Sequence, residues 1–313
     1  MHASDQLDSN ERTQVDSSRV NSPLAIRERS SAWRRLLRDS KAIAGGIILL
    51  ILIAASVGAP LLTNYAPEKQ DIRNKLQAPA WQAGGDSSHL LGTDQLGRDL
   101  LTRILYGGRV SLFIALVATL GASLLGITLG VLSGYFGRFT DTIIMRFVDV
   151  QMAFPSILLA LAVMVMLGTG IRNLVIVLAI TSWVFFSRVV RADVLTIRHR
   201  DYVEAGRAIG ATHWRLIWYY IAPNLVGTIT VVATLTVART IISEASLSFL
   251  GLGIQPPTPS WGGMLADGRG YLSVAWWIGT FPGVALMATV IAVNLLGDAL
   301  RDVLDPQIDT SEH

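Results

Sequence analysis

The sequence contains no cysteine and few charged residues. Without cysteine the chain has no disulfide, cysteine–zinc site, iron–sulfur cluster or thiol nucleophile. Only 16% of its 313 residues are charged, and 51% are hydrophobic. Soluble chains carry about 25% charged residues, so a soluble two-domain enzyme is nearly excluded. The 28 glycines and 11 prolines follow no fixed period, which excludes a collagen-like chain. A net charge of only +3 implies no large basic surface for nucleic acid. These values indicate an integral membrane protein.

Long apolar runs with few charges mark the expected membrane spans. Six spans of about 20–25 residues would use roughly 120–150 residues, which the chain length accommodates. The runs are solidly apolar and lack the alternation of a barrel, so they predict helices. The fold class is therefore an all-α membrane protein with six transmembrane helices. The expected spans are Ala42–Thr63, a segment within Val110–Gly137, Phe147–Leu167, Asn173–Arg191, Ile217–Ser243 and Ala275–Leu296.

The distribution of Lys and Arg orients these spans. With the N-terminus inside, 17 of the 26 basic residues lie on the cytoplasmic side, 8 lie outside, and Arg239 lies within a span. Both termini are therefore predicted to be cytoplasmic. Residues 1–32 are polar and predicted to be a disordered tail, residues 33–306 form the transmembrane domain, and residues 307–313 form a C-terminal tail. The main connections are external loops at 64–109 and 249–274 and a cytoplasmic loop at 192–216.

The cytoplasmic loop leads into the segment RHRDYVEAGRAIGATHWRLIWYYIAPN at residues 198–224. Its first half predicts a short helix with Tyr202, Ala205 and Ile209 on one face. Gly210 suits a helix stop, and Thr212 suits the N-cap of a second short helix. This helix–glycine–helix unit is either a docking element for a soluble partner or an amphipathic connector at the membrane interface.

This segment resembles the EAA loop found in permease subunits of ATP-binding-cassette importers. The family pattern is Glu-Ala-Ala, a Gly six residues after the Glu, and a Pro thirteen residues beyond the Gly. The residues that keep this frame are Glu204, Ala205, Gly210 and Pro223. The chain departs from the pattern with Gly206 in place of the second Ala, and with Tyr220 and Ala222 where aliphatic residues are usual.

Three further segments resemble the second permease subunit of dipeptide, oligopeptide, nickel and glutathione importers. They are LGTDQLGRDLLTRILYGGRVSL at Leu91–Leu112, LSFLGLGIQPPTPSW at Leu247–Trp261 and LLGDALRDVLDP at Leu295–Pro306. The resemblance extends from about residue 33 to residue 306. It implies the type I permease fold and a location in the bacterial cytoplasmic (inner) membrane.

The same resemblance implies a heteromeric complex. Its members would be a second homologous permease, two cytoplasmic ATPase subunits and an extracytoplasmic substrate-binding protein. Short peptides are the expected substrates, with nickel or glutathione as alternatives, and transport would proceed by alternating access. In the family the EAA helix docks on the ATPase. By that match the coupling residues are Asp201, Glu204, Ala205, Gly206, Arg207, Gly210 and His213.

The chain lacks the phosphate-binding motif G-x-x-x-x-G-K-[ST]. We therefore expect ATP and Mg to bind to separate ATPase subunits, and this chain to be a non-catalytic subunit without a cofactor of its own. No metal-ligand motif such as H-E-x-x-H occurs, and all five histidines lie outside the expected spans. An intramembrane enzyme is correspondingly disfavoured.

Small and charged residues within the spans suggest further roles. The stripe Gly126, Gly130 and Gly134 lies on one helical face and would let another helix approach closely, either in this chain or in the partner permease. Asp149 lies one turn after Arg146 and so on the same helical face.

Arg239 and Glu244 are five residues apart, a poor spacing for a pair within one helix. Arg239 either faces the translocation cavity, where it would attract a peptide carboxylate, or pairs with a charge on another helix.

The first external loop contains Asp94, Arg98 and Asp99. By the resemblance this loop would contact the binding protein, and the alternative is that these charges pair within the loop itself.

A self-sufficient secondary transporter or channel is the main rival function. Such a protein needs ion or proton relays near the membrane centre, where these spans carry almost no ionisable side chains. Dependence of uptake on ATP, and co-purification with ATPase subunits, separate the two functions.

Overall fold

The computed structural model describes residues 38–304, so the tails predicted at 1–32 and 307–313 lie outside the described residues. Within this range five helices are long and apolar enough to cross a membrane, and a bent pair of helices is a sixth candidate span. The prediction of an all-helical membrane protein is thereby confirmed, with five spans, or six if the bent pair is one span. The candidate spans are α2 (Ser40–Val57), α4 (Leu100–Phe136), the bent pair α5 (Arg138–Met152) and α6 (Ser156–Leu167), α7 (Ile171–Ile197), the continuous helix of α9 (His213–Arg215), η3 (Leu216–Ile221) and α10 (Ala222–Phe249), and α12 (Trp277–Leu304).

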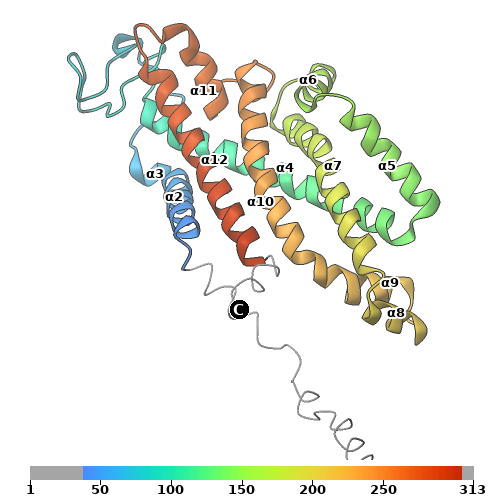
Figure 1. Cartoon of the computed structure of the whole chain (residues 1–313). Helices are drawn as coiled ribbons and strands as arrows, with labels where there is room; N and C mark the ends of the chain where they lie inside the picture. Colours follow the sequence, from blue (N-terminus) through green and yellow to red (C-terminus); the bar gives the residue numbers. More distant parts are fainter. Residues whose placement is uncertain (1–37, 305–313) are drawn as a thin grey trace, which may run out of the picture.

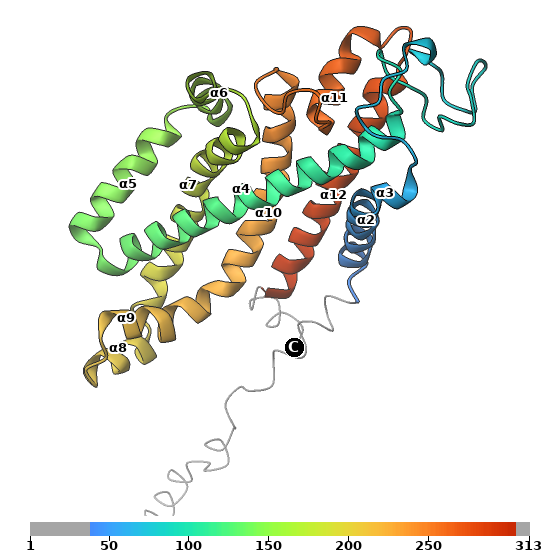
Figure 2. The same ribbon diagram turned by 180° about the vertical axis from the view of Figure 1, so that it is seen from behind.

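Helix α4 is longer than the sequence predicts. The Asp99 carboxylate caps its start by accepting a hydrogen bond from the backbone N–H of Thr102 at 2.8 Å, so the helix begins at Leu100 rather than near Val110. At its other end Gly137 has a φ of +62° and lets the chain reverse into α5. The 37 residues of α4 span about 55 Å at about 1.5 Å per residue. Since the hydrocarbon core is about 30 Å thick, α4 must tilt or extend beyond it, and it runs obliquely across the other helices (Figure 2).

The expected third span, Phe147–Leu167, is not one continuous helix. Helices α5 and α6 meet at an angle of 90°, with the break at residues 153–155. Pro155 explains the break, because proline has no backbone N–H to donate and disfavours helical geometry in the residue before it. An apolar run does not reveal such a bend, because hydropathy reports the polarity of side chains and not the course of the backbone.

The helices form a bundle with two distinct ends (Figure 1). α2 lies beside α12, α10 lies between α12 and α7, and α4 packs against α2, α7 and α10. The start of α2, the end of α12 and the short helices α8 (Asp201–Ala208) and α9 lie toward one end. At the other end lie α6, the 63–99 segment with η2 (Ile72–Asn74), and α11 (Trp261–Gly268) with η4 (Arg269–Tyr271). The short helix α3 (Ala59–Leu62) follows α2.

The glycine stripe of α4 packs within this chain, against α7. A Cβ atom placed on Gly130 would lie 2.8 Å from the Ser187 carbonyl oxygen, and one on Gly134 would lie 2.8 Å from the Val194 Cβ. A Cβ atom on Gly126 would lie closer still to the Trp183 carbonyl oxygen. Glycine is therefore required along this seam because a larger residue would separate the two helix backbones.

Candidate coupling site

Two short helices follow α7 and form the helix–glycine–helix unit that the sequence predicts. Helix α8 begins after Arg200, and Asp201 and Glu204 in its first turn and Arg207 in its last turn complement the helix dipole. Gly210 has a φ of +82°, which ends this helix in a conformation that favours glycine. Thr212 then caps α9, its side chain accepting from the backbone N–H of Arg215 at 3.4 Å. The unit therefore has a defined internal geometry and projects at one end of the bundle (Figure 1).

The face of α8 that packs inward differs from the face that the sequence suggests. Val203 and Gly206 are buried against the rest of the protein. Tyr202, Ala205 and Ile209, the expected apolar face, are instead exposed, with 81% of Ile209 accessible. The charged side chains of α8 are also exposed. The helix thus presents an apolar strip bordered by charges, with no part of the described chain covering it.

Two departures from the EAA pattern lie against each other. A Cβ atom on Gly206 would lie 3.0 Å from the Leu216 Cδ2 and 3.2 Å from the Tyr220 ring. The missing methyl group at Gly206 therefore makes room for the aromatic ring at Tyr220. Tyr220 belongs to η3, a π-helical turn that continues directly into α10.

The coupling helices are tied to the far end of α4. His213 Nδ1 lies 2.8 Å from the Tyr135 hydroxyl, and the Arg198 guanidinium donates to the Gly134 carbonyl at 2.8 Å. Val203 packs in the same buried cluster as Tyr135 and Leu216. A displacement of α8 would consequently shift the residues at the ends of both α4 and α10. His213 acts here as an internal contact, and its expected role toward an ATPase stays a prediction.

An ion pair that the sequence analysis missed strengthens this end of the bundle. Arg191 on α7 binds Asp141 on α5 through two nitrogens, one of them at 2.7 Å from Asp141 Oδ2. Ser133 on α4 donates a hydrogen bond to the same carboxylate. These residues are up to 50 positions apart, so only the reversal of the chain at Gly137 brings them together. The only sequence feature that pointed to this ion pair was the acidic residue Asp141 in the first turn of α5.

The charges expected within the spans do not pair as the sequence suggests. Asp149 binds Arg188 of α7 at 2.8 Å, rather than the nearby Arg146. Glu244 is completely buried and accepts a hydrogen bond from the Ser248 hydroxyl at 2.8 Å. Arg239 is exposed, and its guanidinium lies 4.6 Å from the centre of the Phe185 ring.

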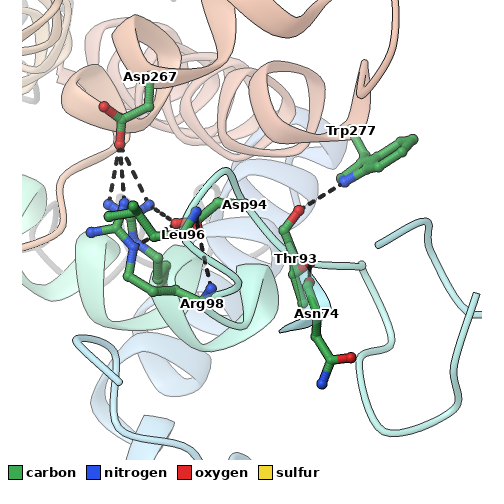
Figure 3. Close-up of polar contacts among 8 residues, drawn as sticks. Asn74, Thr93, Asp94, Leu96, Arg98, Asp267 and Trp277 are labelled. Carbon is green, nitrogen blue, oxygen red and sulfur yellow. Dashed lines mark hydrogen bonds and ion pairs between the residues drawn. The ribbon is translucent and has the colours of Figure 1, made fainter. Parts of the chain in front are cut away.

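At the opposite end of the bundle, charged residues of the 63–99 segment, α4 and α11 form a buried network (Figure 3). Asp94 is fully buried and accepts from Arg98 Nε at 2.6 Å and also from Arg103. Both arginines approach Asp267 of α11, at 3.5 Å and 3.4 Å. The network therefore ties the start of α4 to a helix that follows α10.

Asp99 pairs with His89 at 2.9 Å and not with Arg98. All three residues proposed for binding-protein contact (Asp94, Arg98 and Asp99) have their side chains turned inward. A contact between them and a binding protein stays a prediction, and it would require this segment to open. The structure assigns these residues to the internal framework of the segment.

Comparison with protein families identifies the chain. The model of the binding-protein-dependent transport system inner membrane component matches residues 126–310, which is more than half of the sequence. The chain belongs to this family. A second model, the N-terminal transmembrane domain of oligopeptide transport permease C, matches residues 29–79. The permease thus combines an N-terminal segment around α2 with the helices from α4 onward.

Named relatives cover nearly the whole permease. It is 42% identical over 276 residues to the di/tripeptide transport system permease protein DppC of Pseudomonas aeruginosa (strain UCBPP-PA14), with 88% of this chain and 91% of the relative covered. It is 43% identical to the glutathione transport system permease protein GsiD of Pectobacterium atrosepticum, with 88% and 90% covered. It is 40% identical to the dipeptide transport system permease protein DppC of Escherichia coli (strain K12), with 92% and 96% covered.

A solved structure supports the fold. The permease matches a chain of the inward-facing MetNI methionine ABC transporter with a TM-score of 0.54, over 65% of this chain and 96% of that chain, at 19% identity. At this identity the match concerns the fold alone. The expected type I importer permease fold is thereby confirmed.

Proposed function

We propose that this permease is the second membrane subunit of an ATP-driven importer of short peptides. It would act in the bacterial cytoplasmic membrane with a second permease, two ATPase subunits and an extracytoplasmic binding protein. The observation that carries the proposal is the exposed strip of α8, which has the form of a docking surface and packs through Val203 against the ends of α4 and η3. The names of the relatives support the substrate class, since di/tripeptides, dipeptides and glutathione are all short peptides.

The proposed mechanism is alternating access. Closure of the ATPase dimer on ATP would pull on α8, and the contacts of Val203 and Tyr135 would pass this movement to the long helices. The permease would then open outward, accept substrate from the binding protein, and return inward after hydrolysis. ATP and Mg would bind in the ATPase subunits, and this chain would be non-catalytic. The coupling end of the bundle would be cytoplasmic, with both termini on that side.

Substitution of Ala205 by Arg tests the docking surface. Ala205 is exposed, so the change adds a bulky charge to the strip without entering the core of this chain. We expect the ATPase subunits to be lost during purification in mild detergent, and ATP-dependent dipeptide uptake to fall at least about tenfold, as for disruption of an interface centre. Mass spectrometry of the tagged complex and vesicle uptake provide the two measurements.

The matched control is Ala83→Arg, the same change at an exposed position of the external segment. It should retain the ATPase subunits, because it lies at the other end of the bundle from α8. Wild-type retention of the ATPase subunits and wild-type uptake in Ala205→Arg would contradict docking through α8. Uptake by the wild-type chain alone, without ATP, would instead support the rival secondary transporter, and uptake of nickel but not dipeptide would replace the proposed substrate.

A further inference from the structure

Arg239 lies near the middle of a membrane-spanning helix. It is ten residues before Phe249, the last residue of α10, which places it about 15 Å from that end at about 1.5 Å per residue. The hydrocarbon core is about 30 Å thick. A cation at such depth is costly unless it faces water, a ligand or an opposite charge.

Within residues 38–304, no carboxylate lies within ion-pair distance of Arg239. The nearest acidic residue along the helix, Glu244, is buried and hydrogen-bonded to Ser248. An ion pair between Arg239 and another helix of this chain, one of the two sequence-based alternatives, is therefore not formed by the described residues.

The contact with Phe185 fixes the guanidinium without occupying its donors. The Arg239 Cζ atom lies over the ring, 4.6 Å from its centre, a position favoured by the negative face of an aromatic ring. The N–H donors of a guanidinium lie in its plane and point outward from the edge. A guanidinium held over a ring therefore keeps donors available to bind a carboxylate through two parallel hydrogen bonds.

The face of α10 around Arg239 is mixed, with Leu235 and Ile242 as the apolar neighbours one turn away and polar residues further along. Asn224, Thr228 and Ser246 lie within one stripe with Arg239, because positions separated by 4, 7 or 11 residues share a helical face. Thr228 donates to Asp193 of α7 at 2.5 Å, and Asn224 and Ser246 are exposed or partly exposed. Ionisable side chains within membrane spans face the interior of the assembly or a water-filled cavity rather than lipid. Exposed Arg239 therefore assigns this face of α10 to the interior of the assembly.

We propose that Arg239, held by Phe185, is a substrate-binding residue that takes the carboxylate of a peptide during passage through the membrane. This inference rests on the proposed function and identifies the chemical group that this subunit recognises. The α-carboxylate is the anionic group common to short peptides, so the site accepts peptides of varied side chain and disfavours those whose carboxylate is blocked. The second permease would complete the enclosure around the bound peptide.

The first experiment determines what Arg239 faces. The chain contains no cysteine, so Arg239→Cys introduces a single thiol into it. In the complete reconstituted importer we expect this thiol to react with the membrane-impermeant anion 2-sulfonatoethyl methanethiosulfonate, and alanyl-alanine to slow the reaction. Ala83→Cys, in the exposed external segment, should react at a rate that the dipeptide does not change. Ile51→Cys, on an apolar face of α2 that is 59% exposed, should not react. An unreactive Arg239→Cys would overturn the proposal.

The second experiment tests charge recognition in the same importer. Arg239→Gln should raise the KM for alanyl-alanine about tenfold, the effect of losing one charge-assisted interaction, while Arg239→Lys retains most of the affinity. Treatment of Arg239→Cys with 2-aminoethyl methanethiosulfonate restores a positive charge and should restore uptake, whereas the sulfonate reagent should not.

Three outcomes would contradict this inference. An unchanged KM in Arg239→Gln would exclude carboxylate binding. Dissociation of the two permeases in Arg239→Gln but not in Arg239→Lys would show a structural ion pair with the partner. A wild-type complex that hydrolyses ATP yet moves no dipeptide would show that the proposed substrate class is wrong, and the inference would fail with it. If the wild-type complex takes up dipeptide and Arg239→Gln has an unchanged KM, the role of Arg239 is refuted while the proposed function stands.

Discussion

At the scale of single residues, Gly206 and Tyr220 show how a departure from a family pattern is accommodated. The usual second Ala of the motif would place a methyl group 3.2 Å from the Tyr220 ring. This chain has a residue larger than usual at Tyr220 and one smaller than usual at Gly206. The total volume at the contact between α8 and η3 is therefore similar to that of the family pattern. Such pairs conserve volume across an interface rather than residue type at each position.

Gly206→Ala is expected to disturb the packing of α8 against the Tyr220 ring. Adding Tyr220→Leu to the same chain is expected to remove this steric conflict and restore the packing. The added methyl group should cost about 1 kcal/mol of stability through overpacking, with lower ATP-coupled uptake because α8 shifts. Melting temperature in detergent and uptake in vesicles measure the two effects. If the double variant were no better than Gly206→Ala alone, the compensation inferred from the geometry would be wrong.

At the scale of helices, the seam between α4 and α7 sets the geometry of the bundle. Both helices continue beyond the seam to the coupling end, where Tyr135 and Arg198 contact the α8–α9 region and the helix ends. The Asp141–Arg191 ion pair joins α5 to α7 beside this seam. The two long helices therefore provide a continuous connection from one end of the permease to the other.

Gly130→Ala should disrupt this seam, because the added Cβ would lie 2.8 Å from the Ser187 carbonyl oxygen and 3.0 Å from the Val190 Cβ. Rigid backbone on both sides prevents local relief, so we expect a loss of about 1–3 kcal/mol and a lower melting temperature. Gly46→Ala is the matched control, since its nearest contact is a side-chain atom of Leu296 at 3.9 Å. Equal melting temperatures for the two variants would contradict the importance of the stripe.

At the scale of the whole molecule, the buried network around Asp94 joins segments that are far apart in sequence. Arg103 reaches Asp267, 164 residues along the chain, and the Trp277 indole donates to the Thr93 carbonyl at 3.1 Å. These contacts bind the 63–99 segment and the start of α4 to α11 and α12. Two arginines and two aspartates balance their charges there, which makes the burial of each tolerable.

Asp94→Asn should destabilise the external end far more than Asp267→Asn. Asp94 is fully buried between two arginines, and removing its charge leaves both poorly compensated, at a cost of about 3–5 kcal/mol. The Asp267 side chain is 29% exposed and its ion pairs are 3.4–3.5 Å long, so its loss should cost about 0–1 kcal/mol. Limited proteolysis within residues 63–99 and thermal melting would compare them. A larger effect of Asp267→Asn would show that the network is organised differently.

Much of the architecture follows from local sequence. Apolar runs locate α2, α7, α10 and α12, because helices in a bilayer must satisfy their own backbone hydrogen bonds. Gly210 and Thr212 mark the coupling helices because a positive φ and an N-cap are local requirements. Family motifs indicated the permease function, which the family match supports over residues 126–310.

Only the tertiary structure decided how these parts meet. It turned α8 so that Val203 and Gly206, rather than Tyr202 and Ile209, pack inward. In the folded chain Asp149 forms an ion pair with Arg188, and the Arg239 guanidinium lies over the Phe185 ring. The physical reason is that helix type and span length are set by neighbouring residues and the membrane. Side-chain partners depend on the bends, tilts and close approaches that bring residues tens of positions apart into contact.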